Sequence, residues 1–405
     1  MKKKQIFLRA LYDFANSIVF ANFLLYFSKR IVMEGGLSDL MYNALFAICA
    51  ILLFFSAPML ASYTDRIGKL KKFLNRSTVG VALFYGLAAF SAISWQGIYF
   101  TALFFLFAQY FYQLCFVFYN PMIDDISDEK HRARVSGIGQ FANALGQIVG
   151  LAIFLPLSNN ALAPLLPAVG AFFLLALPMM IRYKDTTKTL TTEKTHPPFT
   201  YRQFFKRLSG FFALSISAPL LIAFFFYQDA LVTITNNFSI YLSNILTVEN
   251  SQITMLFMLL TVMNGVGALL SGRIGDKIWI KKTLIGVLIS RIIILPLLAM
   301  GNAFVVFIAL SIVLGLLIGA MWATSRAYMS ILVAKEEVWY GFSFYTIMER
   351  FASILWPLTR GGIITRLGAS NAGYRTAMWT MTAFVVVGLV VLLARRRGKA
   401  IERLK

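Results

Sequence analysis

Long apolar stretches separated by short polar breaks dominate this chain. Each stretch is about 20 residues long, which is enough for a helix to cross a bilayer core of roughly 30 Å. Breaks such as Trp95-Gln96-Gly97 and Gly301-Asn302 leave room only for tight turns between antiparallel helices. The pattern predicts twelve membrane-spanning helices, over residues 7–28, 41–62, 74–94, 97–119, 136–157, 162–182, 217–243, 252–272, 281–300, 303–325, 338–365 and 374–394.

Composition supports an all-α membrane protein. Of the 405 residues, 59% are hydrophobic and 14% are charged, and the mean hydropathy is +0.73. A soluble protein would carry about 25% charged residues. The net charge of +21 suits basic cytoplasmic loops better than nucleic acid, for which no binding motif is present. The start of the chain predicts a retained first helix, because no small-residue cleavage site follows a short apolar core.

The distribution of lysine and arginine predicts an orientation. With a cytoplasmic N-terminus, 31 of the 38 basic residues fall on the cytoplasmic side and four on the other side. The remaining three, Arg291, Arg350 and Arg360, fall within spans. This asymmetry places both termini in the cytoplasm and favours an even number of spans.

The chain has one long polar linker, residues 183–210, rich in Thr, Lys and Pro. We expect it to be a cytoplasmic connector between two six-helix halves, residues 1–182 and 211–405. The halves repeat each other in three places, in the same order. Asp13 corresponds to Asp229, Asp65 to Asp276, and Gly137 to Gly341. The matches indicate a duplicated six-helix unit.

The loop between the second and third spans carries the strongest motif. Its pattern is Ala61-x-x-x-Asp65-Arg66-x-Gly68-Lys69-x-Lys71. Gly68 permits the tight turn, and Asp65 can accept charge-assisted hydrogen bonds from Arg66 or a neighbouring helix end. This resembles the signature loop of the major facilitator superfamily, with Ala61 in place of the leading glycine. The plain alternative is an ordinary basic loop.

We assign this loop a role in a conformational switch, through Asp65, Arg66, Gly68 and Lys69. The loop after the eighth span, residues 272–282, is a second copy with Trp279 in place of the turn glycine. We expect the same switch role of charged residues at the other cytoplasmic loop ends: Asp125, Arg134, Asp276 and Arg326.

Several further segments resemble one branch of that superfamily, the vacuole-effluxer-like family. The first span, LYDFANSIVFANFLLYF, is similar to the opening of that family. Matching positions elsewhere are Tyr119, Asn120, Asp125, Arg134, Val135, Ser136, Gly137, Gly139, Tyr227, Asp229, Ser325, Arg326, Gly341, Phe342, Tyr345 and Arg350. The resemblance implies twelve helices and export of small solutes, amino acids among them, across a bacterial inner membrane. The implied partners are the lipid bilayer and a small-molecule substrate.

Charged and polar residues inside the spans are candidates for coupling and substrate binding, because burying them in a membrane is costly. Asp13 begins a helical stripe with Asn16 and Ser17, and Asp229 begins another with Asn236. A buried carboxylate can take up a proton on one side and release it on the other. We therefore expect Asp13 or Asp229 to couple transport to protons. The alternative is that each accepts a hydrogen bond from a neighbouring helix.

The remaining substrate candidates are Gln109, Gln113, Tyr227, Tyr345, Glu349 and Arg350. Arg350 suits a substrate carboxylate or an internal carboxylate equally well. For Arg291 we expect an ion pair with another helix. Glycine pairs at 146/150 and 315/319, with the Asn264-Gly265-Val266-Gly267 segment, predict close helix packing.

The sequence predicts a monomeric secondary transporter working by alternating access. No nucleotide-binding loop is present, and the isolated His131 and His196 predict no metal or other cofactor. Two alternatives stay open. One is a carrier of another cargo, such as a drug, lipid or nucleoside, and the other is a membrane-embedded protein without transport activity.

Overall fold

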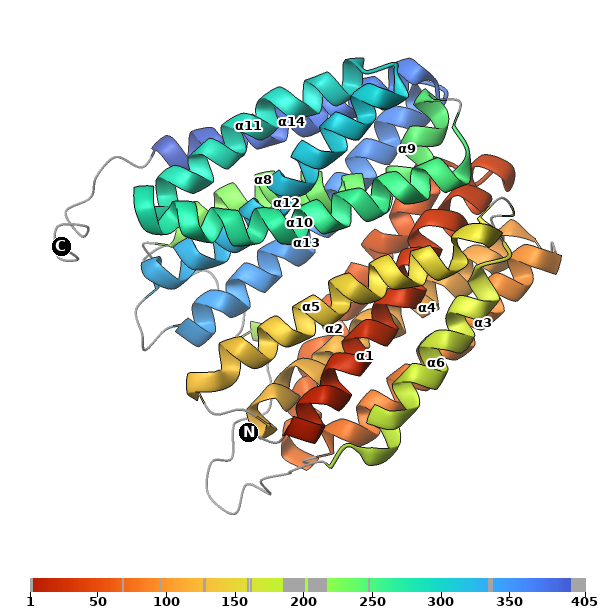
Figure 1. The fold of residues 1–405 in the computed structure, drawn as a ribbon, viewed down its shortest axis with the longest axis vertical. Coiled ribbons are helices and arrows are strands. Elements are labelled where there is room, and N and C mark those ends of the chain that lie inside the picture. The colour runs from red at the N-terminus through yellow and green to blue at the C-terminus, as the bar shows by residue number, and fades with distance from the viewer. Residues whose placement is uncertain are drawn as a thin grey trace. The chain divides into compact units, whose positions relative to one another are not determined.

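A computed structural model of the chain (Figure 1) describes residues 3–67, 69–94, 97–126, 129–158, 160, 162–184, 201–202, 217–246, 248–333 and 338–394. Every regular element in these ranges is a helix. Contacts divide the chain into two compact units. Unit 1 comprises Met1–Thr200, Asn237–Ser243 and Thr247–Thr261, and unit 2 comprises Tyr201–Asn236, Asn244–Leu246 and Val262–Lys405. The predicted linker, residues 183–210, lies mostly outside the described residues.

Unit 1 is a bundle of long helices joined by short turns. Its helices are α1 (Lys3–Asn22), α2 (Asp39–Ile67), α3 (Leu70–Ser94), α4 (Ile98–Tyr119), α5 (Glu129–Phe154) and α6 (Leu165–Arg182). Two π-helical segments, Phe23–Phe27 and Arg30–Glu34, continue α1 well beyond its predicted end at residue 28. Two 3-10 segments, Asn120–Asp125 and Leu155–Leu157, follow α4 and α5.

Unit 2 is built from helices of the same kind. They are α8 (Ala218–Asn236), α10 (Asn250–Ile278), α11 (Ile280–Met300), α12 (Phe304–Leu332), α13 (Val338–Arg366) and α14 (Asn371–Ala394), and a short helix, α9 (Phe238–Ile245), lies between α8 and α10 in the sequence. Unit 1 takes in most of α9 and the first turns of α10. The predicted span 217–243 forms two helices, α8 and α9, which are separated by the single residue Asn237.

The helices suit a membrane. Within the described residues, ten are long and apolar enough to cross one. Large apolar side chains point outward from them, with Tyr99 69%, Leu269 73% and Val305 75% exposed. An apolar surface of this extent belongs in lipid rather than water. Each predicted span coincides with one helix or, for 217–243, with a helix pair, so the predicted fold class is confirmed.

Small residues allow close helix packing, as the sequence predicted. A Cβ atom on Gly146 of α5 would overlap the backbone of Phe14 in α1, and one on Gly150 would come within 3.0 Å of Ile18. In unit 2, a Cβ on Gly267 of α10 or on Gly319 of α12 would overlap the backbone of the facing helix. Gly265, in contrast, faces open space.

Polar side chains hold the α9 and α10 segments within unit 1. Asn43 of α2 and Asn237 exchange two amide hydrogen bonds, of 3.2 and 3.0 Å, and both side chains are buried. The hydroxyls of Tyr26 and Thr254 lie 2.8 Å apart. Buried polar groups that satisfy each other in this way fix one specific packing arrangement.

The turn between α10 and α11 explains the tryptophan in the second copy of the loop motif. Trp279 adopts a left-handed conformation, with φ of 82°, a region that normally favours glycine. Trp279 therefore makes the turn that the motif assigns to a glycine, at the cost of backbone strain.

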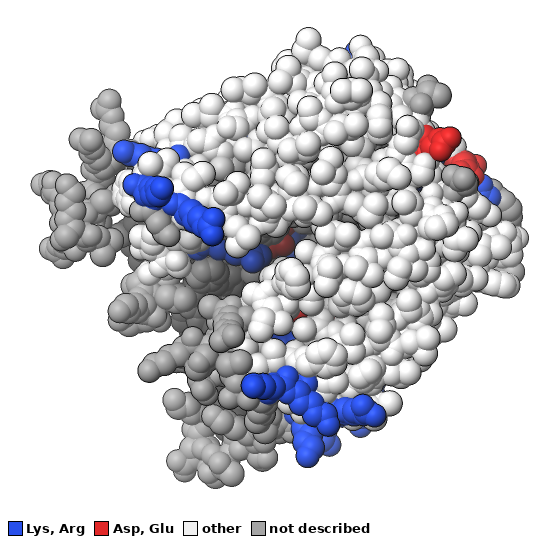
Figure 2. All heavy atoms as spheres, in the orientation of Figure 1, with Lys and Arg blue, Asp and Glu red and all other residues white. Residues whose placement is uncertain are grey.

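Basic side chains gather at one end of each unit (Figure 2). In unit 1 the exposed ones surround the α2–α3 turn and include Lys69, Lys72 and Arg76. In unit 2 they surround the α10–α11 turn and include Arg273, Lys277 and Lys282. These are the ends that the sequence assigns to the cytoplasm, an orientation that stays a prediction.

Candidate functional site

The carboxylate of Asp13 lies inside unit 1, between three helices. Asp13 is in the middle of α1 and is 8% exposed. The Tyr119 hydroxyl, at the end of α4, donates a hydrogen bond to Asp13 Oδ2. Gly139 of α5 closes the third side, where a Cβ atom would come 2.5 Å from Asp13 Oδ2. Residues from two segments that resemble the family, the first span and the junction of the fourth and fifth spans, therefore meet at one carboxylate.

Asp13 has no ion-pair partner among the described residues, although Arg9 stands one helical turn before it. Spacing of four residues on a helix normally favours such a pair. Instead, Arg9 Nη1 donates to the backbone carbonyl of Tyr119 at 2.8 Å. The guanidinium carbon lies 3.9 Å from the centre of the Tyr119 ring. Arg9 is thus tied to Tyr119 and leaves the carboxylate to the tyrosine hydroxyl.

The other polar residues of the predicted α1 stripe bond within their own helix. Asn16 donates to the carbonyl of Tyr12 at 3.1 Å, and Ser17 donates to the carbonyl of Asp13 at 2.7 Å. Both side chains are completely buried, and Asn16 Oδ1 has no hydrogen-bond partner. Their predicted contact with substrate stays a prediction.

Tyr12 and Tyr119 form the aromatic wall of this site. Their rings stack with centroids 5.3 Å apart, and the Tyr12 hydroxyl lies 2.7 Å from the Thr78 hydroxyl on α3. Both tyrosines are buried. The stacking fixes the Tyr119 ring, so its hydroxyl is held against Asp13.

Unit 2 contains a related cluster around Tyr227 of α8. The Tyr227 hydroxyl lies 2.9 Å from that of Ser325 on α12. One turn earlier on α8, Phe224 stacks on Tyr345 of α13, with centroids 3.9 Å apart. The side chain of Asp229, the other predicted coupling residue, lies outside the described residues.

Arg291 of α11 is completely buried in unit 2. Its Nη1 donates to the carbonyl of Tyr227 at 3.0 Å and lies 3.1 Å from the sulfur of Met321. The Nε and Nη2 groups have no hydrogen-bond partner. We expected an ion pair here, and none is found among the described residues. Gln228, the residue after Tyr227, is also completely buried, with both amide atoms unpartnered.

We predict opposite effects on stability and transport for Arg291→Met. In the described part of the chain the buried Arg291 has no carboxylate partner. Replacing buried ionic groups with apolar side chains of similar volume often stabilises a protein by about 1–4 kcal/mol. Thermal unfolding of the purified protein should therefore occur at higher temperature. Transport should fall, because intramembrane charges are kept for function. A less stable variant with normal transport would contradict this expectation.

The other predicted substrate residues are spread over both units. Gln109 is buried on α4 and donates to the Tyr85 hydroxyl at 3.0 Å, whereas Gln113 is half-buried. Asn236 is buried at the end of α8, and Glu349 and Arg350 are half-buried on α13. In unit 1 the structure brings Asp13 together with Tyr119. In unit 2 it brings Tyr227, Ser325, Tyr345 and Glu349 close to one another.

Most of the predicted switch residues fall where no side chain is described: Asp65, Arg66, Gly68, Asp125, Arg134 and Asp276. Lys69 is exposed. The guanidinium of Arg326, also exposed, lies 4.8 Å from the ring centre of Trp322. The switch role stays a prediction for all eight residues.

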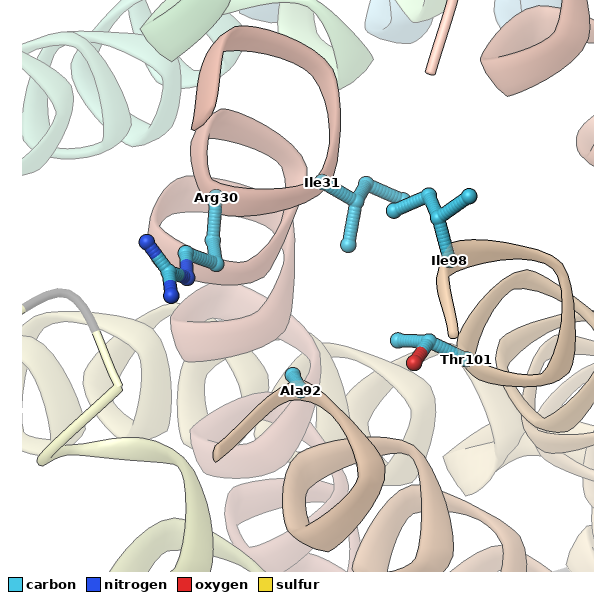
Figure 3. A pocket seen from close by; sticks show the side chains of 5 residues that line it. All are labelled: Arg30, Ile31, Ala92, Ile98 and Thr101. Atoms are coloured by element: carbon cyan, nitrogen blue, oxygen red, sulfur yellow. The ribbon is translucent and has the colours of Figure 1, made fainter. Parts of the chain in front are cut away.

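A small pocket lies elsewhere in unit 1 (Figure 3). It is lined by Arg30, Ile31, Ala92, Ile98 and Thr101. The Arg30 guanidinium forms an ion pair with Glu34, and the Thr101 hydroxyl lies 2.7 Å from that of Ser91. The residues that line the pocket are not part of the Asp13 site, and Arg30 is the one charged residue among them.

Comparison with known proteins identifies the family. The profile described as Major Facilitator Superfamily matches residues 6–235, and the profile described as Vacuole effluxer Atg22 like matches residues 122–404. The chain belongs to the major facilitator superfamily. Within this superfamily it is a member of the Atg22-like vacuole effluxers. It is therefore an integral membrane transporter rather than an enzyme, and both resemblances seen in the sequence are confirmed.

Individual relatives agree with this membership. An uncharacterized transporter of the superfamily from Bacillus subtilis (strain 168), YxiO, is 26% identical over 94% of this chain and 92% of its own length. Two solved structures share the fold. The nucleoside transporter NupG is 14% identical, with a TM-score of 0.75 over 97% of this chain and 99% of its own. A bacterial homologue of the human lysosomal transporter Spinster is 14% identical, with a TM-score of 0.76 over 97% of both chains.

Two residues of the Asp13 site, Tyr119 and Arg9, are not among the predicted substrate residues, although the transporter's sequence carries a signal for each. Tyr119 matched a family position, but nothing in the sequence placed it against Asp13. Arg9 stands four positions before Asp13, a spacing that marks neighbours on a helix.

Proposed function

We propose that this transporter exports a small polar or zwitterionic solute, with amino acids first, by alternating access coupled to protons. It works as a monomer in a bacterial inner membrane, with both termini in the cytoplasm. The name of the matched family, a vacuole effluxer, supports the direction, and the basic ends of the two units support the orientation.

The proposal that transport is coupled to protons rests on one observation: Asp13 is a buried carboxylate without an ion-pair partner in the described part of the chain. A salt bridge stabilises the ionised form of a carboxylate. A tyrosine hydroxyl can donate to the ionised form and accept from the protonated form, so a carboxylate bonded to it can take up a proton and keep its partner. We assign to Asp13 the binding and release of the proton that is coupled to solute transport. Asp229 stays the alternative and enters the same tests.

Transport into inside-out membrane vesicles tests this proposal. Vesicles with an acidic lumen should accumulate labelled amino acids, and a protonophore should abolish the accumulation. A panel that also contains nucleosides, sugars and lipid-like compounds identifies the cargo class. Accumulation that ignores the pH gradient would contradict proton coupling. Uptake restricted to nucleosides or lipid-like compounds would contradict the proposed cargo.

A further inference from the structure

The Tyr119 hydroxyl lies between two acceptors and has one proton. It is hydrogen-bonded to Asp13 Oδ2 and also lies 2.9 Å from the backbone carbonyl oxygen of Arg9. A phenol can donate to only one acceptor at a time, and a backbone carbonyl can never donate. When Tyr119 donates to Arg9, its contact with Asp13 is a hydrogen bond only if the carboxyl supplies a proton. When Asp13 is ionised, the tyrosine proton must turn toward it.

The ionisable groups around Asp13 are few. Arg9 faces it from its own helix, and Tyr112 and Tyr119 face it from α4. Two further helices pack extensively on α1: α5, which contributes Gly139, and α6. Within the described residues, neither of these two helices brings an ionisable side chain into contact with the carboxyl. In the part of the chain that the structure describes, the one hydroxyl bonded to the Asp13 carboxylate is that of Tyr119.

Tyr119 is also placed to pass on the state of Asp13. It is the last residue of α4 and leads directly into the 3-10 segment Asn120–Asp125, which connects to α5. Its ring lies under the Arg9 guanidinium, and its carbonyl accepts from Arg9 Nη1. A change in the hydrogen bonds of the Tyr119 hydroxyl can therefore shift the position of Tyr119 and of the α4–α5 junction that follows it.

We propose that Tyr119 is a positioning residue that registers the protonation of Asp13 and transmits it to the α4–α5 junction. With Asp13 ionised, the tyrosine donates to the carboxylate. With Asp13 protonated, the carboxyl donates to the tyrosine, which donates in turn to the carbonyl of Arg9. This inference rests on the proposed role of Asp13 in proton coupling.

Tyr119→Phe tests the proposal, because it removes the hydroxyl and keeps the ring that stacks on Tyr12. A hydrogen bond to an ionised group favours the charged form. Without it, the pH at which gradient-driven transport is half-maximal should rise by about one to two units. Tyr112→Phe is the matched control, since Tyr112 lies on the same helix near Asp13 without a hydrogen bond to it among the described contacts, and should keep the wild-type profile.

A second measurement does not depend on the folding of Tyr119→Phe. In the infrared difference spectrum between acidic and neutral pH, the wild-type protein should show a carboxyl band and a tyrosine band that change together. Both changes should disappear in Asp13→Asn. A carboxyl band that titrates without a tyrosine change, or an unshifted pH profile in Tyr119→Phe, would overturn the proposal. Gradient-driven transport that survives in Asp13→Asn would instead refute the proposed function itself.

Discussion

Asp13→Asn is expected to abolish accumulation driven by a pH gradient. For one proton exchanged per solute, a gradient of one pH unit sustains about a tenfold concentration ratio. The variant should reach a ratio of one, because an amide has the shape of a carboxyl group but does not carry a proton. The amide still accepts a hydrogen bond from Tyr119, so the fold should be kept. The measurement is the steady-state ratio of labelled solute in vesicles.

Solute exchange without a gradient serves as the control for this variant. Exchange requires binding and movement of the helices but no net proton transfer, so Asp13→Asn should retain it. Expression and thermal unfolding should match the wild type. Loss of exchange together with loss of accumulation would mean that Asp13 supports binding or folding rather than coupling.

Two alanine substitutions on α5 are expected to change stability in opposite directions. Gly146→Ala places a Cβ atom against the backbone of Phe14, which cannot move aside cheaply, so we expect a loss of about 1–3 kcal/mol. Gly137→Ala adds the same atom on the same helix where nothing lies within 4 Å. Because alanine favours a helix over glycine, this variant should gain about 0.5–1 kcal/mol.

The same comparison applies to unit 2. Gly319→Ala on α12 would overlap the backbone of α10 at Asn264, whereas Gly272→Ala on α10 meets nothing within 4 Å. Thermal unfolding of the four purified variants in detergent gives the order of stability. Equal unfolding temperatures for Gly146→Ala and Gly137→Ala would contradict the close approach of α1 and α5.

Hydrophobic pattern was enough to predict the helices of this fold, because lipid leaves few alternatives for an apolar stretch of 20 residues. It did not predict where helices bend or end. The break at Asn237 depends on its amide pairing with Asn43, a residue 194 positions away. The extension of α1 through Glu34 runs past Lys29 and Arg30, charges that hydropathy alone treats as an end.

The candidate site was predictable in its residues but not in its contacts. Asp13 stood out as a charge inside an apolar span, and Tyr119 and Gly139 as parts of motifs. That these three meet depends on how α1, α4 and α5 pack, which no spacing along the chain encodes. Arg291 shows the same limit. Its position within an apolar span predicted that it is buried. Its hydrogen bond to the Tyr227 carbonyl could not be predicted, because every residue has a backbone carbonyl and the sequence does not distinguish one from another.

Proton release on solute binding tests the role of Asp13 most directly. Purified transporter in weak buffer, with a pH-sensitive dye, should release protons when a transported amino acid is added, up to one per solute bound. Asp13→Asn should bind the solute and release none, and Asp229→Asn should behave like the wild type. Unchanged release from Asp13→Asn, or loss of release in Asp229→Asn alone, would contradict the assignment of the coupling proton to Asp13.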